Sequence, residues 1–462
     1  MQEVLDELAQ LIGADNIATD GPTLESHGRD WTRFYEPDPL AVLFPRDIDS
    51  VQAVVRFAIE HNLGLVPSGG RTGLSGGAVA KDHELVVSFD KMNQILDFNE
   101  TELTVEVEPG LVTEVLQNFA AKKGLFYPVD FASSGSSQIG GNIATNAGGI
   151  KVLRYGLTRD WVLGLTVVTG RGDILRLNKG LVKNATGYDL RHLFIGSEGT
   201  LGFIVGATLA LTVAQKSPSV ILLAASRMQD VISVLEKFRS QVTLSAFEFF
   251  SEQALQHVLH ERGGAHPFST AAPFYVLLEF ENSAETNIEA AMAAFENCIE
   301  AGWVSDGIVS QSESQRLQLW SYREGISEAI TPYTPYKNDV SVRISRVPSF
   351  LDAVETLVKK ACPEFEIVWF GHIGDGNVHL NILRPLDWPI AEFKAECEKV
   401  SRGVMSIVAE FDGSVSAEHG VGLLKRDQLG FSRSKEEIAM MQAIKLAFDP
   451  AGIMNPGKLF ES

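Results

Sequence analysis

Two short segments in the last quarter of the chain contain residues that could hold a metal ion and move a proton. The first, GHIGDGNVHLN, carries His372 and His379, and the second, SAEHG, carries Glu418 and His419. Two imidazoles and one carboxylate suit Zn²⁺ with an open coordination position, although non-haem iron uses the same ligands. The histidine beside the carboxylate is a ready proton acceptor. These residue types therefore predict metal-assisted proton chemistry.

The spacing of the two histidines favours a hairpin. If residues 374–377 form its loop, His372 and His379 face each other across two strands and can bind one ion. Glu418 would then supply the third ligand from another segment, and Asp375 would organise the turn. Adjacent residues of a strand point to opposite faces, so Glu418 and His419 can share a site only if the backbone bends there, which nearby glycines favour.

The elements that must position these segments form two α/β regions, with a boundary near residue 215. We expect domains at 1–215 and 216–417, with 418–462 returning to the first. Expected helices cover 1–12, 47–61, 112–123, 286–301, 314–330 and 435–448. Expected strands cover 41–45, 63–67, 84–89, 104–108, 161–169, 173–177, 201–213, 274–280, 337–347 and 366–370.

Composition narrows the function classes. The formal charge of -20 argues against a nucleic-acid partner, because phosphate backbones need clustered Lys and Arg. No apolar stretch approaches the ~18 residues of a membrane-spanning helix, and the acidic N-terminal segment does not read as a secretory signal. The 3 cysteines are far apart, which suits a reducing cytoplasm and excludes a CxxC redox pair. We therefore expect a cytoplasmic protein without an integral membrane segment.

Glycine-rich segments mark a second kind of site. They cover residues 67–77, 133–149 and 196–202. Glycine lets the backbone approach a ligand closely, and successive N–H groups form a nest for an anion such as a pyrophosphate. The first segment is neither a P-loop nor a GxGxxG fingerprint. One such segment is as readily a surface loop, but two in one domain favour a large cofactor that lies against backbone.

These segments give the chain its resemblance to a family. It resembles the FAD-linked oxidases of the vanillyl-alcohol oxidase type, and within them the D-2-hydroxyacid dehydrogenases, with the D-2-hydroxyglutarate dehydrogenases as the most similar subgroup. The resemblance implies an α+β fold with a two-part FAD-binding domain of the PCMH type. It also implies an α/β substrate domain with an antiparallel sheet and a short C-terminal helical segment. The matching segments are 67–77, 134–149, 183–189, 196–202, 371–381, 418–422 and 455–458.

The resemblance also implies which residues bind FAD. The first loop would hold the pyrophosphate, and the second loop would surround the flavin and the ribityl chain. Two residues of the third region would face the adenosine side. Two C-terminal residues would close over the flavin. Arg71 stands where several relatives carry the histidine that binds FAD covalently, so we expect non-covalent FAD. The residues are Pro67, Ser68, Gly69, Gly70, Arg71, Thr72, Gly73, Leu74, Ser134, Gly135, Ser136, Ser137, Gly140, Gly141, Asn142, Thr145, Gly149, Glu198, Ile204, Asn455 and Lys458.

Substrate-binding roles follow from the same resemblance. Arg323, Ser327 and Lys337 would hold a distal carboxylate, and Asn381 would contact the substrate near the metal. Arg323 and Ser327 are four residues apart on an expected helix, hence on one face. By composition alone, each of these residues would be a solvated surface residue. Among them, Arg323 is best suited to a carboxylate because guanidinium binds it bidentately.

The expected mechanism follows from chemistry. A 2-hydroxyacid chelates a metal ion through its hydroxyl and carboxylate, and the ion lowers the pKa of the hydroxyl. His419 takes the proton, and the Cα hydrogen leaves as hydride to the flavin N5, giving a 2-oxoacid. The resemblance implies His372, His379 and Glu418 as the ligands of this Zn²⁺ or other divalent ion.

Other functions remain open from the sequence. They are a D-lactate- or glycolate-type subunit of a respiratory complex, a non-redox flavin lyase resembling alkyl-glycerone-phosphate synthase, and a metal-dependent hydrolase that uses only the three ligands. The metal set disfavours the lyase. Without an NAD fingerprint or iron–sulfur cysteines, an electron-transfer flavoprotein or a quinone is the expected acceptor. A homodimer is one open oligomeric state.

Overall fold

The structure is a computed structural model that describes residues 2–32 and 34–461. Its chain divides into two compact units. Unit 1 contains residues 1–148, 156–214 and 418–462, and unit 2 contains residues 149–155 and 215–417. Met1 and Ser462, the outer ends of the expected domain ranges, lie outside the described residues. The chain passes from one unit to the other at 148/149, 155/156, 214/215 and 417/418.

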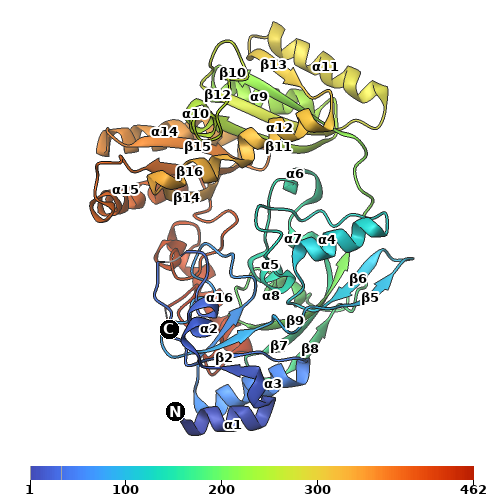
Figure 1. The fold of residues 1–462 in the computed structure, drawn as a ribbon, viewed down its shortest axis with the longest axis vertical. Helices are drawn as coiled ribbons and strands as arrows, with labels where there is room; N and C mark the ends of the chain where they lie inside the picture. Colours follow the sequence, from blue (N-terminus) through green and yellow to red (C-terminus); the bar gives the residue numbers. More distant parts are fainter. Residues whose placement is uncertain (1, 33, 462) are drawn as a thin grey trace. The chain divides into compact units, whose positions relative to one another are not determined.

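Unit 1 contains two sheets (Figure 1). In the first, of order β1-β2-β4-β3, the three longer strands are parallel: β2 (Ala41–Leu43), β4 (Leu85–Ser88) and β3 (Leu65–Ser68), with β1 (Ile17–Ala18) antiparallel at the edge. The second is antiparallel, of order β5-β6-β9-β7-β8. Its strands are β5 (Ile95–Asn99), β6 (Thr104–Val107), β9 (Gly202–Ala210), β7 (Val162–Thr169) and β8 (Ile174–Leu177).

Some helices of unit 1 begin at residues whose side chains cap them. In α3 (Ile48–His61) the Asp47 side chain accepts a hydrogen bond from the Ser50 N–H, and Asn62 ends the helix in the left-handed region. The apolar face of α3 is buried together with that of α1 (Gln2–Ile12) against the parallel sheet. The other main helices are α2 (Gly21–His27), α4 (Thr113–Lys122), α5 (Ile139–Thr145) and α16 (Lys435–Phe448).

Unit 2 is built on one seven-stranded antiparallel sheet, of order β13-β10-β12-β11-β15-β16-β14 (Figure 1). Its strands are β10 (Pro218–Ala225), β11 (Leu244–Ser251), β12 (Phe274–Glu281), β13 (Val304–Val309), β14 (Tyr336–Ser341), β15 (Glu366–Gly371) and β16 (Asn377–Leu383). Its helices are α6 (Val152–Tyr155), α9 (Met228–Arg239), α10 (Glu252–Arg262), α11 (Glu285–Glu300), α12 (Glu313–Glu324), α13 (Ile326–Ala329), α14 (Val347–Ala361) and α15 (Ile390–Glu410).

Two expected elements of unit 2 are wrong in extent. The single helix over 314–330 is two helices, α12 and α13, interrupted at Gly325, a residue with weak helix propensity that packs against the Arg262 guanidinium. The strand over 337–347 ends at Ser341, and Val347 begins α14, whose first turn contains a proline suited to that position. No helix within the described residues is long and apolar enough to cross a membrane.

Candidate metal and flavin sites

A hairpin is present as predicted, but its loop covers residues 372–376 rather than the expected 374–377, so His372 lies in the turn and not on a strand. Strands β15 and β16 pair antiparallel with His379 opposite Phe370, and the turn between them contains His372. Gly376 has φ +89°, and a Cβ there would lie 2.2 Å from the Val342 carbonyl oxygen, so the turn requires glycine. Asp375 accepts a hydrogen bond from the Asn377 N–H at 3.1 Å and thereby shapes the turn, as expected.

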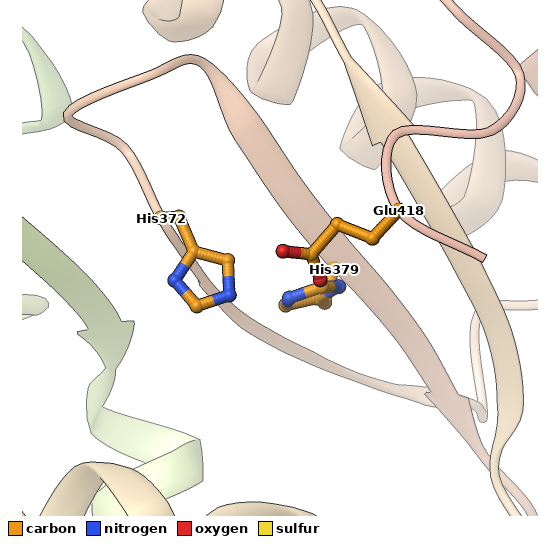
Figure 2. Close-up of side chains that lie close together, drawn as sticks. All are labelled: His372, His379 and Glu418. Atoms are coloured by element: carbon orange, nitrogen blue, oxygen red, sulfur yellow. The ribbon is translucent and has the colours of Figure 1, made fainter. Parts of the chain in front are cut away.

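Glu418 completes a set of three possible metal ligands. One ligand atom from each of His372, His379 and Glu418 lies within 4.8 Å of the other two. In Figure 2 the carboxylate of Glu418 points toward both imidazoles. Unit 2 ends at Ala417, the residue before Glu418, and the Ala417 N–H donates to the Asp339 carbonyl on β14 at 3.4 Å. The edge of this sheet therefore fixes where Glu418 enters the site.

The backbone bends at Glu418 and His419, as their sharing of a site requires. Residues 417–419 form a bend, and Gly420 follows with φ +77°. Ligand atoms of Asp339, Glu418 and His419 consequently lie within 4.8 Å of one another. The side chains of Glu418 and His419 therefore lie close together, and the imidazole of His419 is beside the carboxylate that could bind the ion.

Each of the two hairpin histidines faces a carboxylate through Nδ1. His372 Nδ1 lies 2.8 Å from Glu248 Oε1, and His379 Nδ1 lies 3.5 Å from Asp339 Oδ1. Both carboxylates are buried. A carboxylate that accepts from one ring nitrogen fixes the tautomer and leaves Nε2 for a metal ion. The donor chemistry of this site therefore fits a divalent cation.

Glu248, on β11, was not singled out from the sequence. Its second oxygen, Oε2, forms an ion pair of 2.8 Å with an Arg323 terminal nitrogen. Burial by itself raises the pKa of the Glu248 carboxyl, but His372 and Arg323 outweigh that effect, so the net pKa lies below the ordinary value. A glutamate in the otherwise apolar run LSAFEFFS was the available signal.

Three of the four expected substrate residues lie beside the histidine hairpin. Lys337 of β14 pairs with Asn381 of β16, and two residues further along Asp339 pairs with His379. Because alternate residues of a strand point to the same face, all four side chains belong to one face of the sheet. The Arg323 guanidinium lies 4.8 Å from the centre of the Phe370 ring, and Phe370 pairs with His379.

Ser327 does not share a face with Arg323. Arg323 is buried in α12, whereas Ser327 is exposed in α13, beyond the interruption at Gly325. The prediction of a common face was wrong because it assumed one continuous helix. The alternative reading of Arg323 as a solvated surface residue does not hold, since Arg323 is buried with Glu248 as its partner.

The first two glycine-rich segments of unit 1 pack directly on each other. A Cβ added to Gly70 would lie 2.2 Å from the Ser136 carbonyl oxygen, so only glycine allows this approach. Arg71 has φ +57° and donates to the Gly69 carbonyl at 2.9 Å, with the Asp90 carboxylate 3.4 Å away. Glycine backbone and one guanidinium thus meet where an anion could bind.

Two further residues of the second segment form hydrogen bonds within unit 1. Asn142 donates to the Thr113 hydroxyl at 2.6 Å, and Thr145 donates to the Gly141 carbonyl at 3.0 Å. Gly149, by contrast, belongs to unit 2. The expected cofactor residues of unit 1 in these segments are Pro67 and Ser68 at the end of β3, Gly69, Gly70, Arg71, Thr72, Gly73 and Leu74 after it, Ser134, Gly135, Ser136 and Ser137 before α5, and Gly140, Gly141, Asn142 and Thr145 within it.

Glu198 makes contacts that the sequence did not predict. Its buried carboxylate accepts hydrogen bonds of 2.8 Å from the N–H groups of Val421 and Gly422, so it anchors the C-terminal segment within unit 1. Burial raises the pKa of this carboxyl despite those bonds. Asn455 Nδ2 donates to the Glu198 carbonyl at 2.7 Å. Ile204, the other residue expected near the adenosine, is buried on β9.

Lys458 is a buried cation. Its side chain is 1% exposed, and its Nζ has no hydrogen-bond partner within the described part of the chain. Burial lowers the pKa of its ammonium group to about 8. A buried ammonium group without a hydrogen-bond acceptor fits an anionic or oxygen-rich cofactor such as FAD, which would supply the missing acceptor.

Comparison with protein families identifies the chain. Residues 39–178 match the FAD binding domain model, and residues 214–459 match the model described as FAD linked oxidases, C-terminal domain. This chain belongs to the FAD-linked oxidases. Among curated relatives of this oxidase, D-2-hydroxyglutarate dehydrogenase of Stutzerimonas stutzeri is 55% identical over 99% of the chain and 98% of the relative. The mitochondrial D-2-hydroxyglutarate dehydrogenase of Arabidopsis thaliana is 36% identical over 97% and 80%.

Solved structures confirm the fold of this FAD-linked oxidase. Substrate-bound p-cresol methylhydroxylase superposes with a TM-score of 0.78 at 15% identity, covering 100% of the chain and 97% of that structure. The expected α+β class, with a two-part FAD-binding region and a substrate region on an antiparallel sheet, is therefore correct. FAD is the cofactor that the family model of residues 39–178 indicates.

Proposed function

We propose that this FAD-linked oxidase oxidises D-2-hydroxyglutarate to 2-oxoglutarate. The single observation that supports this most is the 55% identity, over nearly the full chain, to a D-2-hydroxyglutarate dehydrogenase. The geometry of unit 2 agrees with such a substrate, because cationic Arg323 and Lys337 accompany the donor set of His372 and His379. Two carboxylates and one hydroxyl on a small substrate match that combination of groups.

The metal ligands in this proposal are His372, His379 and Glu418. A divalent ion there would polarise the substrate hydroxyl and lower its pKa. Glu248 would accept the Nδ1 hydrogen of His372 and so leave Nε2 of that ring for the ion, while Asp339 Oδ1 lies 3.5 Å from His379 Nδ1. Zn²⁺ suits this set with one position open, and non-haem iron is the alternative.

His419 is the proposed base. Its ring lies beside Glu418 and Asp339, close enough for a substrate hydroxyl held at the metal to reach it. The neighbouring Asp339 carboxylate would stabilise the imidazolium that forms after proton transfer. Asn381 and Lys337 would hold the substrate against this base from the same sheet face, and Arg323 would bind the distal carboxylate. The exposed Ser327 would contribute least.

FAD, when bound, accepts the two electrons and the hydrogen that leave the substrate carbon. In this proposal unit 1 is the FAD-binding domain and unit 2 is the substrate domain. Of the 21 positions named from the sequence as cofactor contacts, all except Gly149 belong to unit 1. Binding is non-covalent because Arg71 occupies the first loop, where neither histidine nor cysteine is present. An electron-transfer flavoprotein or quinone as acceptor and a cytoplasmic location remain predictions.

Anaerobic reduction of the bound flavin tests the proposal. The purified holoenzyme is mixed with D-2-hydroxyglutarate, L-2-hydroxyglutarate, D-lactate, D-malate or glycolate, before and after dialysis against a chelator. We expect bleaching to be fastest with D-2-hydroxyglutarate, to be lost after chelation, and to return with added Zn²⁺. Bleaching that prefers D-lactate or glycolate would contradict the substrate, and bleaching that survives full metal removal would contradict the metal.

A further inference from the structure

A single buried carboxylate joins the two functional groups of unit 2. Glu248 Oε1 lies 2.8 Å from His372 Nδ1, and Glu248 Oε2 lies 2.8 Å from an Arg323 terminal nitrogen. The side chain of Glu248 is 1% exposed, that of His372 is 10% exposed and that of Arg323 is 9% exposed. A buried glutamate at such a place is stable only if both of its oxygens are compensated, so neither partner can be removed without consequence for the other.

Oε1 of Glu248 orients His372 through a hydrogen bond, whereas Oε2 holds Arg323 as an ion pair. Because Oε1 takes the Nδ1 hydrogen of His372, Nε2 is the ring nitrogen left for an ion. Arg323 has five N–H donors, and its Nε has no hydrogen-bond partner within the described residues. Arg323 can therefore keep its ion pair with Glu248 and still donate hydrogen bonds to a second carboxylate from its other N–H groups. The Phe370 ring, 4.8 Å from the guanidinium, limits how the arginine can turn.

We propose that Glu248 is a positioning residue that couples the metal centre to recognition of the second carboxylate of the substrate. It holds His372 as a metal ligand and holds Arg323 as the receptor for that carboxylate, so changes at either group alter the other. The proposal rests on the proposed function, because it takes His372 as a ligand and Arg323 as a substrate contact. It adds a residue that touches neither ion nor substrate.

The coupling predicts effects of opposite sign on metal affinity. Glu248→Gln keeps the side-chain volume but removes the negative charge, so His372 becomes a weaker ligand and metal affinity falls about 10- to 100-fold. Arg323→Ala leaves the Glu248 charge uncompensated and removes a cation near the ion, so metal affinity rises several-fold. Both variants raise KM for D-2-hydroxyglutarate more than KM for D-lactate, since both disturb the guanidinium.

Metal affinity is measured by competition between holoenzyme and a chromophoric zinc chelator, and KM is measured with both substrates. Glu279→Gln is the matched control: Glu279 is equally buried in the same sheet and forms ion pairs with Lys151 and Arg316. That variant tests for a general loss of stability and should leave zinc affinity and the ratio of the two KM values unchanged. Unchanged zinc affinity in both Glu248→Gln and Arg323→Ala overturns the coupling.

His372→Ala separates this proposal from the proposed function. If His372→Ala keeps its zinc, the metal site itself is wrong, whatever the Glu248 variants show. If His372→Ala loses zinc while Glu248→Gln binds it like the natural protein, the metal site stands and the coupling is overturned. Should Glu248→Gln fail to fold, Arg323→Ala alone decides, because a structural role without coupling predicts no gain in zinc affinity.

Discussion

At the scale of single residues, the proposed role of each histidine depends on which groups surround its imidazole ring. His372 and His379 each have Nδ1 near a buried carboxylate, and both belong to the proposed metal set. His419 instead lies next to a proposed ligand and near Asp339, a position suited to receiving a proton. The three histidines thus have different proposed roles because His372 and His379 belong to the hairpin, whereas His419 follows Glu418 on another segment.

Replacement of His419 tests its role. We expect His419→Ala to bind FAD and metal normally and to lose about 10²- to 10⁴-fold in kcat, because the substrate hydroxyl then lacks its proton acceptor. The measurements are kcat, the flavin spectrum and metal content. His260→Ala, which changes an exposed histidine on α10, is the control. A near-normal kcat in His419→Ala would remove this residue from the mechanism.

Lys458 predicts a pH dependence of stability in the FAD-free protein. The pKa of its ammonium group is about 8 in the folded state, against an ordinary value of 10.5. Between these two pH values the unfolded chain therefore binds more protons than the folded chain, and stability rises with pH. Below pH ~8 the ammonium is charged in both states and its full burial cost, on the order of 3 kcal/mol, remains. Lys458→Met should raise the melting temperature of apoprotein at neutral pH and flatten this rise.

Bound FAD gives the comparison for that prediction. An acceptor beside Lys458 removes the burial cost, so the substitution should stabilise holoenzyme less than apoprotein, or destabilise it. Lys435→Met, at the exposed start of α16, should change neither curve. Equal melting shifts of Lys458→Met with and without FAD would argue against a contact with the cofactor.

At the scale of elements, periodic segments were predictable and interruptions were not. Helix α16 was predicted at its observed bounds, and the β15–β16 turn followed from its glycines. The break at Gly325 was missed because a lone glycine in a helical pattern usually costs stability without ending the helix. Glu248 was missed because its partners, on α12 and after β15, are set by tertiary packing. Only contacts across the sheet could reveal that ion pair.

The hairpin turn can be tested through Gly376. Gly376→Ala should destabilise the protein by about 1–3 kcal/mol and lower zinc affinity, because the added methyl would strike the Val342 carbonyl and shift both histidines. Chemical denaturation and zinc competition measure the two effects. Gly302→Ala has a similar φ of +72° but no atom within 4 Å of the new Cβ, so it isolates backbone strain. Normal zinc affinity in Gly376→Ala would show that the ligands tolerate a shifted turn.

At the scale of the whole molecule, ion pairs hold the short segment 149–155 within unit 2. Residues 149–155 belong to unit 2 although the segments on either side belong to unit 1. Lys151 pairs with buried Glu279, and Arg154 lies 2.9 Å from Glu281, both on β12. Glu279 also accepts a hydrogen bond of 3.0 Å from the Trp320 indole. The segment begins at Gly149, the last residue of the second glycine-rich segment, and these pairs hold it to β12 within unit 2.

Loss of the lysine should therefore destabilise unit 2. We expect Lys151→Met to cost at most about 3 kcal/mol, the lower end for a broken buried pair, because Arg316 and Trp320 still contact the carboxylate. Chemical denaturation measures the loss. The double variant Lys151→Met/Glu279→Gln should recover part of it, since no buried charge is then left unpaired. A double variant less stable than the sum of the single ones would contradict this account.

The return of residues 418–462 to unit 1 has a consequence for biosynthesis. Met454 pairs with Leu65 of β3, and Asn455 holds the Gly77 carbonyl at 2.8 Å, so the first glycine-rich segment is completed by residues translated almost four hundred positions later. Unit 1 begins to emerge from the ribosome first but can close only after all of unit 2 has been made. Until then its parallel sheet lacks a neighbour, and that interval is when the nascent chain is most in need of chaperones.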